Sequence, residues 1–401
     1  SGSGFARTGG ADQETLSMTQ PPLSLYLHLP WCVQKCPYCD FNSHAGGDPS
    51  ARQRYLDALL LDLEVEASLA AGRTIETVFL GGGTPSLFLP DEIAGLLEAV
   101  RAQFDVAADA EITMEANPGT VECGEPAGYR DAGVNRLSFG GQSFNDEHLK
   151  KLGRIHSSRD ILSAVDDARR AGIENINIDL MHGLPGQCVA EARQDIAAAA
   201  GLEPAHISWY QLTLEPNTIF FARPPKGMPD DETAHEIQDQ GQALLEEKGF
   251  RQYEVSAYAR ENQVCRHNLN YWLFGDYLAV GAGAHGKISD ARGIFRYVKP
   301  ANPLQYMRTM EADQYQRKQA LIEKDDLVFE FMLNALRLTE GFSESVFCER
   351  TGRSANELAE ATQSASRKGL IIREDNAVWR PTSLGKRFLN DLQAEFLLEG
   401  P

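Results

Sequence analysis

Residues 23–41 read LSLYLHLPWCVQKCPYCDF, and this stretch decides the fold. Its first seven residues alternate leucine with other side chains and predict a strand, which runs directly into a loop that carries three cysteines. The spacing Cys32-x3-Cys36-x2-Cys39 places three thiols close together. Thiolates are soft ligands that suit iron–sulfur clusters, zinc or copper. Three sulfurs can hold three corners of a cubane, so the loop predicts a [4Fe–4S] cluster with one open iron.

Two other interpretations of the loop compete with the cluster. The thiols would also suit a zinc site that is completed by His44 or His28, because a structural zinc site is closed by four ligands. Alternatively, the three cysteines share a loop by chance. The loop lies directly after a strand, and the functional residues of βα barrels lie at the carboxyl ends of strands. This position favours the cluster.

Short β-rich runs alternate with amphipathic stretches along the first half of the chain. The expected strands after residues 23–29 are residues 77–80, 111–115, 136–139, 175–180 and 206–211. The expected helices are residues 51–70, 91–104, 158–171 and 190–200. Strands that alternate with helices predict right-handed βαβ units and a parallel sheet. We therefore expect an α/β fold, a partial (β/α)6 TIM-like barrel, with a doubly wound sheet as the alternative.

Polar, glycine-rich or cysteine-rich segments follow each expected strand. Strand two runs into GGGTPS, strand three into EANPGT, strand four into GGQSF and strand five into DLMHGLPG. The carboxyl ends of parallel strands meet at one edge, so these segments predict one shared site. No lysine follows the glycines of GGGTPS, which argues against a phosphate-binding P-loop.

The chain divides into four parts by composition. Residues 1–20 read as a flexible extension without the apolar run of a signal peptide, and residues 21–215 form the barrel core. Residues 216–324 are an accessory region that contains the HNLNYW motif. Residues 325–401 predict helices, a hairpin and a last helix, which is the order of a small winged-helix-like domain.

Charge and cysteine content exclude several classes of protein. The net charge is −19, from 38 basic and 57 acidic residues, so no basic footprint indicates a nucleic-acid partner. The seven cysteines are few for 401 residues and three of them cluster, which argues against a disulfide framework. The sequence therefore favours a reducing compartment, and we expect a cytoplasmic protein.

The ordered motifs resemble those of the radical SAM superfamily, in which S-adenosylmethionine (SAM) binds the open iron of the cluster. YLHLPWCVQKCPYCDFNSH, GGGTPS, EANPGT, SFGGQSF, LGRIH and NIDLMHGLPGQ occur in the order of the oxygen-independent coproporphyrinogen III oxidase-like family. The resemblance implies a radical SAM barrel and a set of SAM-binding residues. These are Tyr26, Tyr38, Gly82, Gly83, Thr84, Glu115, Gln142, Arg154 and Asp179. Gly141 departs from the family, which usually has valine there.

Two features resemble the heme chaperone branch of this family more than its oxidases. The oxidases have a further cysteine two residues after the third ligand, where this chain has Phe41. The motif HNLNYW, from His267 to Trp272, is typical of the chaperone branch. The resemblance implies heme as a ligand, and His267 is the candidate for the iron, with Cys265 as a competitor. No catalytic residue is assigned.

We therefore expect a heme chaperone that binds heme and transfers it to an acceptor hemoprotein, which the family association suggests is respiratory. The [4Fe–4S] cluster and SAM would be structural or regulatory. The alternative is a radical SAM enzyme, an oxidase or methyltransferase that acts on a porphyrin-like substrate, although Phe41 disfavours coproporphyrinogen III oxidase activity. The expected partners are heme and the acceptor, with no nucleic acid. The resemblance also allows peripheral contact with membrane proteins and a homodimer.

Overall fold

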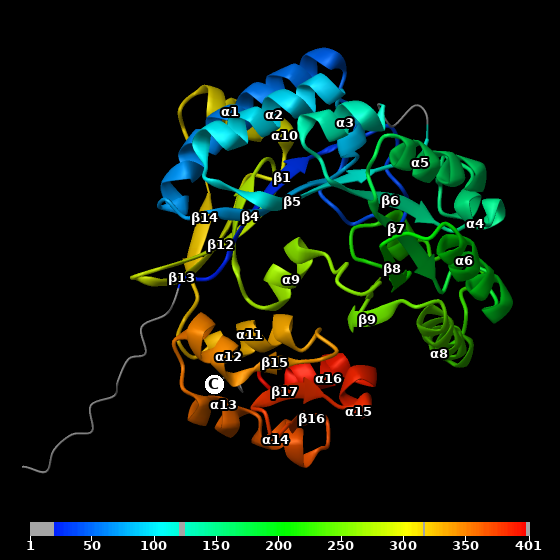
Figure 1. Ribbon diagram of the computed structural model, residues 1–401, viewed down its shortest axis with the longest axis vertical. Coiled ribbons are helices and arrows are strands. Elements are labelled where there is room, and N and C mark those ends of the chain that lie inside the picture. The colour runs from blue at the N-terminus through cyan, green and yellow to red at the C-terminus, as the bar shows by residue number, and fades with distance from the viewer. Residues whose placement is uncertain (1–19, 120–124, 316, 398–401) are drawn as a thin grey trace, which may run out of the picture.

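Strand β1 (Leu23–Leu29) lies inside a sheet of twelve strands in the computed structural model (Figure 1). Its four leucines are buried in the main core with the outer helices. Successive side chains of a strand point to opposite faces, so Tyr26 and His28 point to the other side of the sheet. One face of β1 therefore supplies packing, and the other face is available for a site.

The structure describes residues 20–119, 125–315 and 317–397. The predicted N-terminal extension thus lies outside the described residues, except for its last position. The last four residues of the predicted C-terminal domain lie outside them as well.

Seven neighbouring strands of the sheet are parallel. In spatial order they are β11 (Asp276–Val280), β1, β4 (Ile75–Gly82), β5 (Val106–Ala116), β6 (Arg136–Gln142), β7 (Asn175–His182) and β8 (His206–Gln211). Antiparallel strands extend both edges. They are β12 (His285–Asp290), β13 (Gly293–Val298) and β14 (Lys318–Leu321) beyond β11, and β10 (Ala257–Ala259) and β9 (Arg251–Glu254) beyond β8. Among the described residues the outermost strands do not pair with each other, so the sheet is open.

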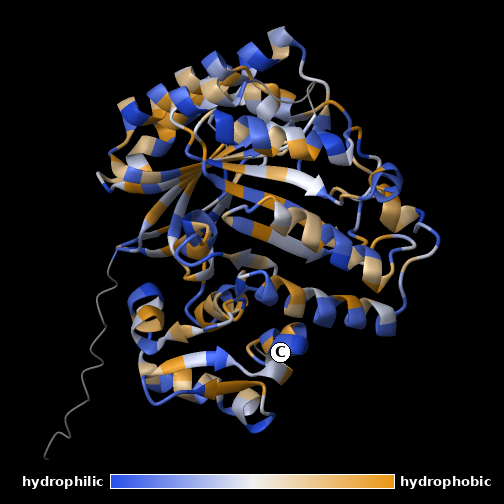
Figure 2. Ribbon diagram, turned by 45° about the vertical axis from the view of Figure 1, so that its right-hand side comes forward, coloured by the Kyte–Doolittle hydropathy of each residue, from blue (hydrophilic) through white to orange (hydrophobic). Residues whose placement is uncertain are grey.

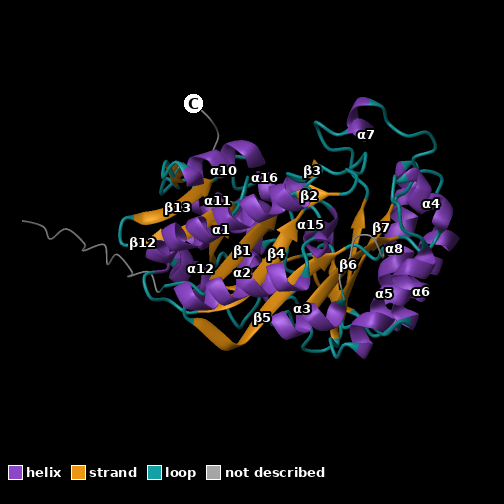
Figure 3. Cartoon of the chain, turned by 90° about the horizontal axis from the view of Figure 1, so that it is seen from above, coloured by secondary structure: helices purple, strands orange, loops and turns teal. Residues whose placement is uncertain are grey.

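Helices cover the outer face of the sheet (Figures 1 and 3). They include α1 (Pro49–Ala70), α2 (Pro90–Gln103), α3 (Pro126–Ala132), α5 (Ser158–Arg170) and α6 (Val189–Gly201). Figure 2 shows hydrophobic and hydrophilic residues in alternation along these helices, as expected for helices with one buried face. Local signals fix their starts: the side chain of Asp48 accepts a hydrogen bond from the N–H of Ala51 at α1, and Ser157 and Asp160 form a capping box at α5.

The six predicted βα units and the α/β fold are confirmed. Strand β11 is a seventh parallel strand, contributed by the accessory region, and it pairs with β1. The accessory region therefore extends the main sheet. The helices of the accessory region are α7 (Ile219–Ala222), α8 (Asp231–Glu247), α9 (Arg266–Trp272) and α10 (Pro303–Glu311). The core has two further short helices, η1 (Pro85–Leu87) and α4 (Asp146–Lys151).

Helix α9 lies on the inner side of the sheet, between the sheet and the C-terminal part of the chain (Figure 1). That part has its own core, with Phe331, Phe347 and Trp379 buried in it. Its helices are α11 (Leu327–Ala335), α12 (Glu344–Thr351), α13 (Ala355–Ala361), α14 (Gln363–Arg367), α15 (Ser383–Arg387) and α16 (Leu389–Ala394). Its strands are β15 (Phe342–Ser343), β16 (Ile371–Arg373) and β17 (Val378–Pro381). Helices followed by a hairpin agree with a winged-helix-like fold.

Within the described ranges, no helix has the length and apolar character that crossing a membrane requires.

Candidate functional site

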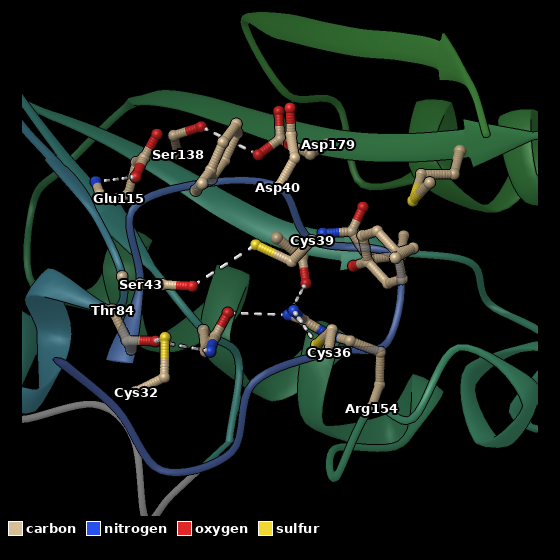
Figure 4. Close-up of a pocket in the computed structure, with 18 of the residues that line it drawn as sticks. Cys32, Cys36, Cys39, Asp40, Ser43, Thr84, Glu115, Ser138, Arg154 and Asp179 are labelled. Carbon is tan, nitrogen blue, oxygen red and sulfur yellow. Dashed lines mark hydrogen bonds between the residues drawn. The ribbon is translucent and has the colours of Figure 1, made fainter. Parts of the chain in front are cut away.

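A cavity of about 310 Å³ opens at the carboxyl ends of the parallel strands (Figure 4). Cys32, Cys36 and Cys39 line one side of it, and residues from β4, β5, β6, β7 and β8 line the other. We call it the three-cysteine cavity. Its position is the one at which parallel α/β sheets place their ligands.

Each of the three sulfurs has a polar neighbour. The Thr84 hydroxyl lies 3.5 Å from the Cys32 sulfur, and the Ser43 hydroxyl lies 3.6 Å from the Cys39 sulfur. The Arg154 guanidinium lies 3.7 Å from the Cys36 sulfur. Hydroxyl and guanidinium donors stabilise thiolates, the form in which cysteine binds metal. The donor set of this cavity therefore fits a thiolate-bound cluster.

The histidines of the zinc interpretation are already engaged. His28 is buried, with Nε2 at 2.9 Å from the carbonyl of Asn42 and Nδ1 at 3.1 Å from the Tyr26 hydroxyl. Nε2 of His44 lies 3.1 Å from the side-chain oxygen of Asn42. A fourth ligand from either imidazole would have to break these contacts. Among the described residues no three His, Cys, Asp or Glu side chains converge on a single ion.

Close packing requires the glycines at the end of β4. Gly82 has φ +122°, and a Cβ atom there would lie 2.6 Å from the His28 ring. A Cβ atom on Gly83 would lie 2.6 Å from the Trp31 carbonyl oxygen. The N–H groups of Gly83 and Thr84 donate to the carbonyls of Leu29 and Trp31. The glycine segment thus holds the start of the cysteine loop against the sheet.

Glu115 is a half-buried carboxyl on β5 that accepts a hydrogen bond of 3.0 Å from the Gly82 N–H. Burial raises its pKa to about 7, and the nearby charge of Asp179 adds to the rise. Burial also raises the pKa of Asp179, whose carboxylate accepts from Asn177 at 2.8 Å and from Ser138 at 3.3 Å. Two desolvated carboxyls favour the binding of a ligand that is cationic or that donates hydrogen bonds.

Arg154 and Gln142 lie on the side of the cavity near β6. The Arg154 guanidinium donates to the side-chain oxygen of Asn117 at 2.7 Å and to the carbonyl of Gly140 at 2.6 Å. Gln142 has φ +68° at an irregularity of β6, and it accepts from the Tyr210 hydroxyl at 2.9 Å. A Cβ atom on Gly141 would meet its neighbours at 3.4 Å, so space does not require this glycine.

The structure brings most of the predicted residues together. The three-cysteine cavity is lined by Cys32, Cys36, Tyr38, Cys39, Gly82, Gly83, Thr84, Glu115, Gln142, Arg154 and Asp179. Tyr26 lines a neighbouring cavity instead. The sequence reasoning missed Ser43, Asn117, Ser138 and Tyr210, which also line the cavity. Asn117 lies in the EANPGT segment, so its strand-end position was an available signal.

His267 lies outside the three-cysteine cavity. Its imidazole is only 1% exposed, with Nδ1 at 2.8 Å from the Thr77 hydroxyl and Nε2 at 2.7 Å from the Tyr271 hydroxyl. Iron ligation by this residue, as the sequence suggested, would require breaking one of these bonds. The competitor Cys265 is also buried, and burial raises the pKa of its thiol to about 12. Neither group presents a free ligand atom to a cavity.

Two family models match the chain. The model of the radical SAM superfamily matches residues 26–199, which carry the three cysteines and the strand-end residues. The model of the HemN C-terminal domain matches residues 322–388. The two matches follow the same division as the main sheet and the C-terminal part.

Curated relatives match along nearly the whole chain. Heme chaperone HemW of Haemophilus influenzae is 47% identical over 94% of this chain and 99% of its own length. The protein of the same name from Escherichia coli is also 47% identical, and that from Bacillus subtilis is 33% identical, with the same coverage. Among solved structures, coproporphyrinogen III oxidase (HemN) from Escherichia coli has the same fold, with a TM-score of 0.79, 24% identity, and coverage of 96% of this chain and 92% of that one.

The cysteine loop, the strand-end residues and these full-length matches agree. The chain belongs to the HemW family, and it carries a radical SAM domain followed by a HemN C-terminal domain.

Proposed function

We propose that this chain is a heme chaperone, which binds heme and transfers it to an acceptor hemoprotein. The observation that carries the proposal is the 47% identity to two curated heme chaperones along 94% of the chain. The matches cover 99% of each relative, so they extend over both domains.

The proposal includes a [4Fe–4S] cluster on Cys32, Cys36 and Cys39. A cluster held by three thiolates supplies an open iron for the amino and carboxylate groups of SAM. Thr84, Ser43 and Arg154 would donate to the thiolates, since their polar atoms lie 3.5, 3.6 and 3.7 Å from the three sulfurs. Such donors stabilise the thiolates that the cluster needs.

The polar lining of the three-cysteine cavity fits the other end of SAM. Glu115 and Asp179 would accept from the ammonium and the ribose hydroxyls, since both carboxyls line the cavity and are partly buried there. Gln142 would accept from a hydroxyl, and Arg154 would donate to the carboxylate of SAM. Tyr38 and the glycines would shape the wall.

The alternative function is a radical SAM enzyme that acts on a porphyrin-like substrate. Glu115 favours it, because a pKa of about 7 suits a group that exchanges protons at neutral pH. The absence of a cysteine at position 41 disfavours an oxidase of the coproporphyrinogen type. Phe41 is 59% exposed beside the third ligand, where it offers an apolar contact instead.

One experiment separates the two functions. The chain is purified without oxygen, its iron and sulfide are measured, and heme or coproporphyrinogen with SAM and a reductant is then added. The chaperone takes up stoichiometric heme and leaves coproporphyrinogen unchanged. Multiple turnovers of a porphyrin substrate would overturn the chaperone assignment.

The remaining parts of the proposal concern surroundings and partners. Among the described residues, Cys188, Cys265 and Cys348 form no disulfide, which suits a reducing compartment such as the cytoplasm. A respiratory hemoprotein is the proposed acceptor, reached at the membrane surface, and the chaperone is proposed to act as a homodimer. Crosslinking in cells that express the tagged full chain, followed by identification of heme proteins, tests the acceptor.

A further inference from the structure

A second cavity, of about 570 Å³, adjoins the three-cysteine cavity on the inner side of the sheet. Asp40, Phe41, Gly82 and Glu115 line both cavities. Much of the remaining wall is aromatic, with side chains from α9 and β11. We call it the aromatic cavity. A cavity of this size, with aromatic rings and polar groups in its wall, is large enough for a small-molecule ligand.

Helix α9 builds the aromatic wall, and His267 holds it in place. Tyr271 and Trp272 line the cavity, while His267 lies behind them and binds the Tyr271 hydroxyl at 2.7 Å. The His267 ring also packs on Phe79 with a centroid distance of 5.0 Å. Burial lowers the pKa of His267 to about 3, so this imidazole stays neutral. The Thr77 hydroxyl donates to Ser24, so Nδ1–H of His267 donates to Thr77 and Nε2 accepts the hydrogen bond from Tyr271. The histidine of the motif therefore positions an aromatic wall.

Two imidazoles line the aromatic cavity, and only one of them is free. His28 uses both ring nitrogens, on the Tyr26 hydroxyl and the Asn42 carbonyl. His285, the first residue of β12, is exposed, and its ring makes no hydrogen bond to any described residue. The neighbouring groups partly desolvate the ring of His285, and together with the charge of Arg296 they lower its pKa, so the imidazole is neutral at pH 7. A neutral imidazole with a free lone pair is a ligand for heme iron.

The turn before His285 is fixed from behind by helix α1. The N–H of Gly281 donates to the buried carboxylate of Asp62 at 3.0 Å, and the N–H of Ala282 donates to the Tyr55 hydroxyl at 2.8 Å. Both partners are buried on α1. His285 is therefore presented by a rigid turn, as a ligand with a fixed position requires.

The charged side chains in and near the aromatic cavity limit where the carboxylates of a planar ligand could lie. Glu115 and Asp40 lie where the two cavities meet, and they would repel such an edge. On the other side, Arg296 donates to the Tyr277 hydroxyl at 3.0 Å, and the Arg337 guanidinium lies 4.4 Å from the centre of the Trp272 ring. Both guanidiniums form ion pairs, Arg296 with Glu330 and Arg337 with Glu254, so the carboxylates of a bound porphyrin would compete with these glutamates for them.

We infer that the aromatic cavity is the binding site for the heme that this chain transfers, and that His285 is the iron ligand. The inference rests on the proposed chaperone function. Phe41, Tyr271 and Trp272 contact the porphyrin face. His267 is a positioning residue that acts through Tyr271. The site lies beside the three-cysteine cavity, so the loop that carries the cluster ligands also forms part of its wall.

The test is a titration of the full, cluster-containing chain with hemin, followed by the Soret band. Wild type binds with the spectrum of imidazole-ligated heme. H285A loses that spectrum and binds at least tenfold more weakly, and added free imidazole restores the band. H285C replaces the spectrum with that of thiolate ligation, which a merely structural role for His285 would not produce.

Matched variants separate the possible failures. H235A removes a histidine on α8 that does not line the aromatic cavity, and it should bind as wild type does. H267Q should keep the imidazole-ligated spectrum while its affinity falls, because the wall loosens but the ligand stays. An unchanged spectrum and affinity in H285A would overturn His285 as the ligand, and loss of the imidazole spectrum in H267Q would assign the iron to His267. A wild-type chain that binds no heme would instead refute the proposed function itself.

Discussion

At the scale of single residues, the cysteines were the clearest signal in the sequence. Their spacing needs only local chain, so it is visible without a structure. The sequence alone does not predict His285 as a ligand, because that role depends on which histidine rings already make hydrogen bonds in the folded chain. The same holds for His267, which the motif singled out and which the structure buries behind Tyr271.

The cluster ligands give the first prediction at this scale. Replacing Cys32, Cys36 or Cys39 by alanine removes one of three thiolates, so the iron content of the anaerobically purified chain should fall from about four per chain toward zero. Iron and sulfide analysis measures it. C188A is the matched control, since Cys188 is exposed at the start of α6. Full iron content in C36A would contradict the assignment.

Glu115 gives a prediction on pH. Its pKa of about 7 means that the carboxyl is neutral below pH 7 and must lose a proton to accept from a cationic ligand. SAM affinity should therefore rise about tenfold between pH 6 and pH 8. Calorimetric titration measures it, and E115Q should bind more weakly with a flatter profile. E98Q, on the exposed side of α2, should match wild type. Identical profiles for E115Q and wild type would exclude Glu115 from the SAM site.

At the scale of elements, alternation of strands and helices predicted the first six βα units well. Residues 23–29 and 206–211 were placed at the observed bounds of β1 and β8, because hydrophobic period and turn residues are local signals. Strand β11 was not counted as a seventh unit. It lies more than 240 residues from β1 along the chain. It joins the parallel sheet by pairing with β1, for example Leu25 with Leu278, and local sequence signals do not reveal this long-range pairing.

Helix α1 and the turn before β12 give a prediction on stability. Asp62 is buried, binds the ammonium of Lys299, and accepts from Gly281 and Tyr306. D62A would leave the Lys299 charge buried beside Glu66 alone, so the free energy of unfolding should fall by about 3–5 kcal/mol. Denaturant unfolding of the full chain measures it. D57A, one turn earlier on the exposed side of α1, should change stability little, and equal losses in both variants would refute the argument.

At the scale of the whole molecule, two cavities share one wall. The three-cysteine cavity lies at the strand ends, and the aromatic cavity lies between the sheet, α9 and the C-terminal domain. The contact between the sheet and α11 includes the bonds of Arg296 to Glu330 at 2.6 and 2.8 Å. This arrangement places the proposed cargo beside the proposed cofactor and near the C-terminal domain.

Heme transfer is the measurement that tests the central claim most directly. The heme-loaded full chain is mixed anaerobically, with SAM present, with the heme-free form of a respiratory cytochrome, and the two Soret bands are followed together with 5′-deoxyadenosine. We expect one heme per chain to move to the cytochrome faster than free heme binds it, without accumulation of 5′-deoxyadenosine. Transfer no faster than that of free heme, or heme chemistry that consumes SAM over many turnovers, would contradict the account.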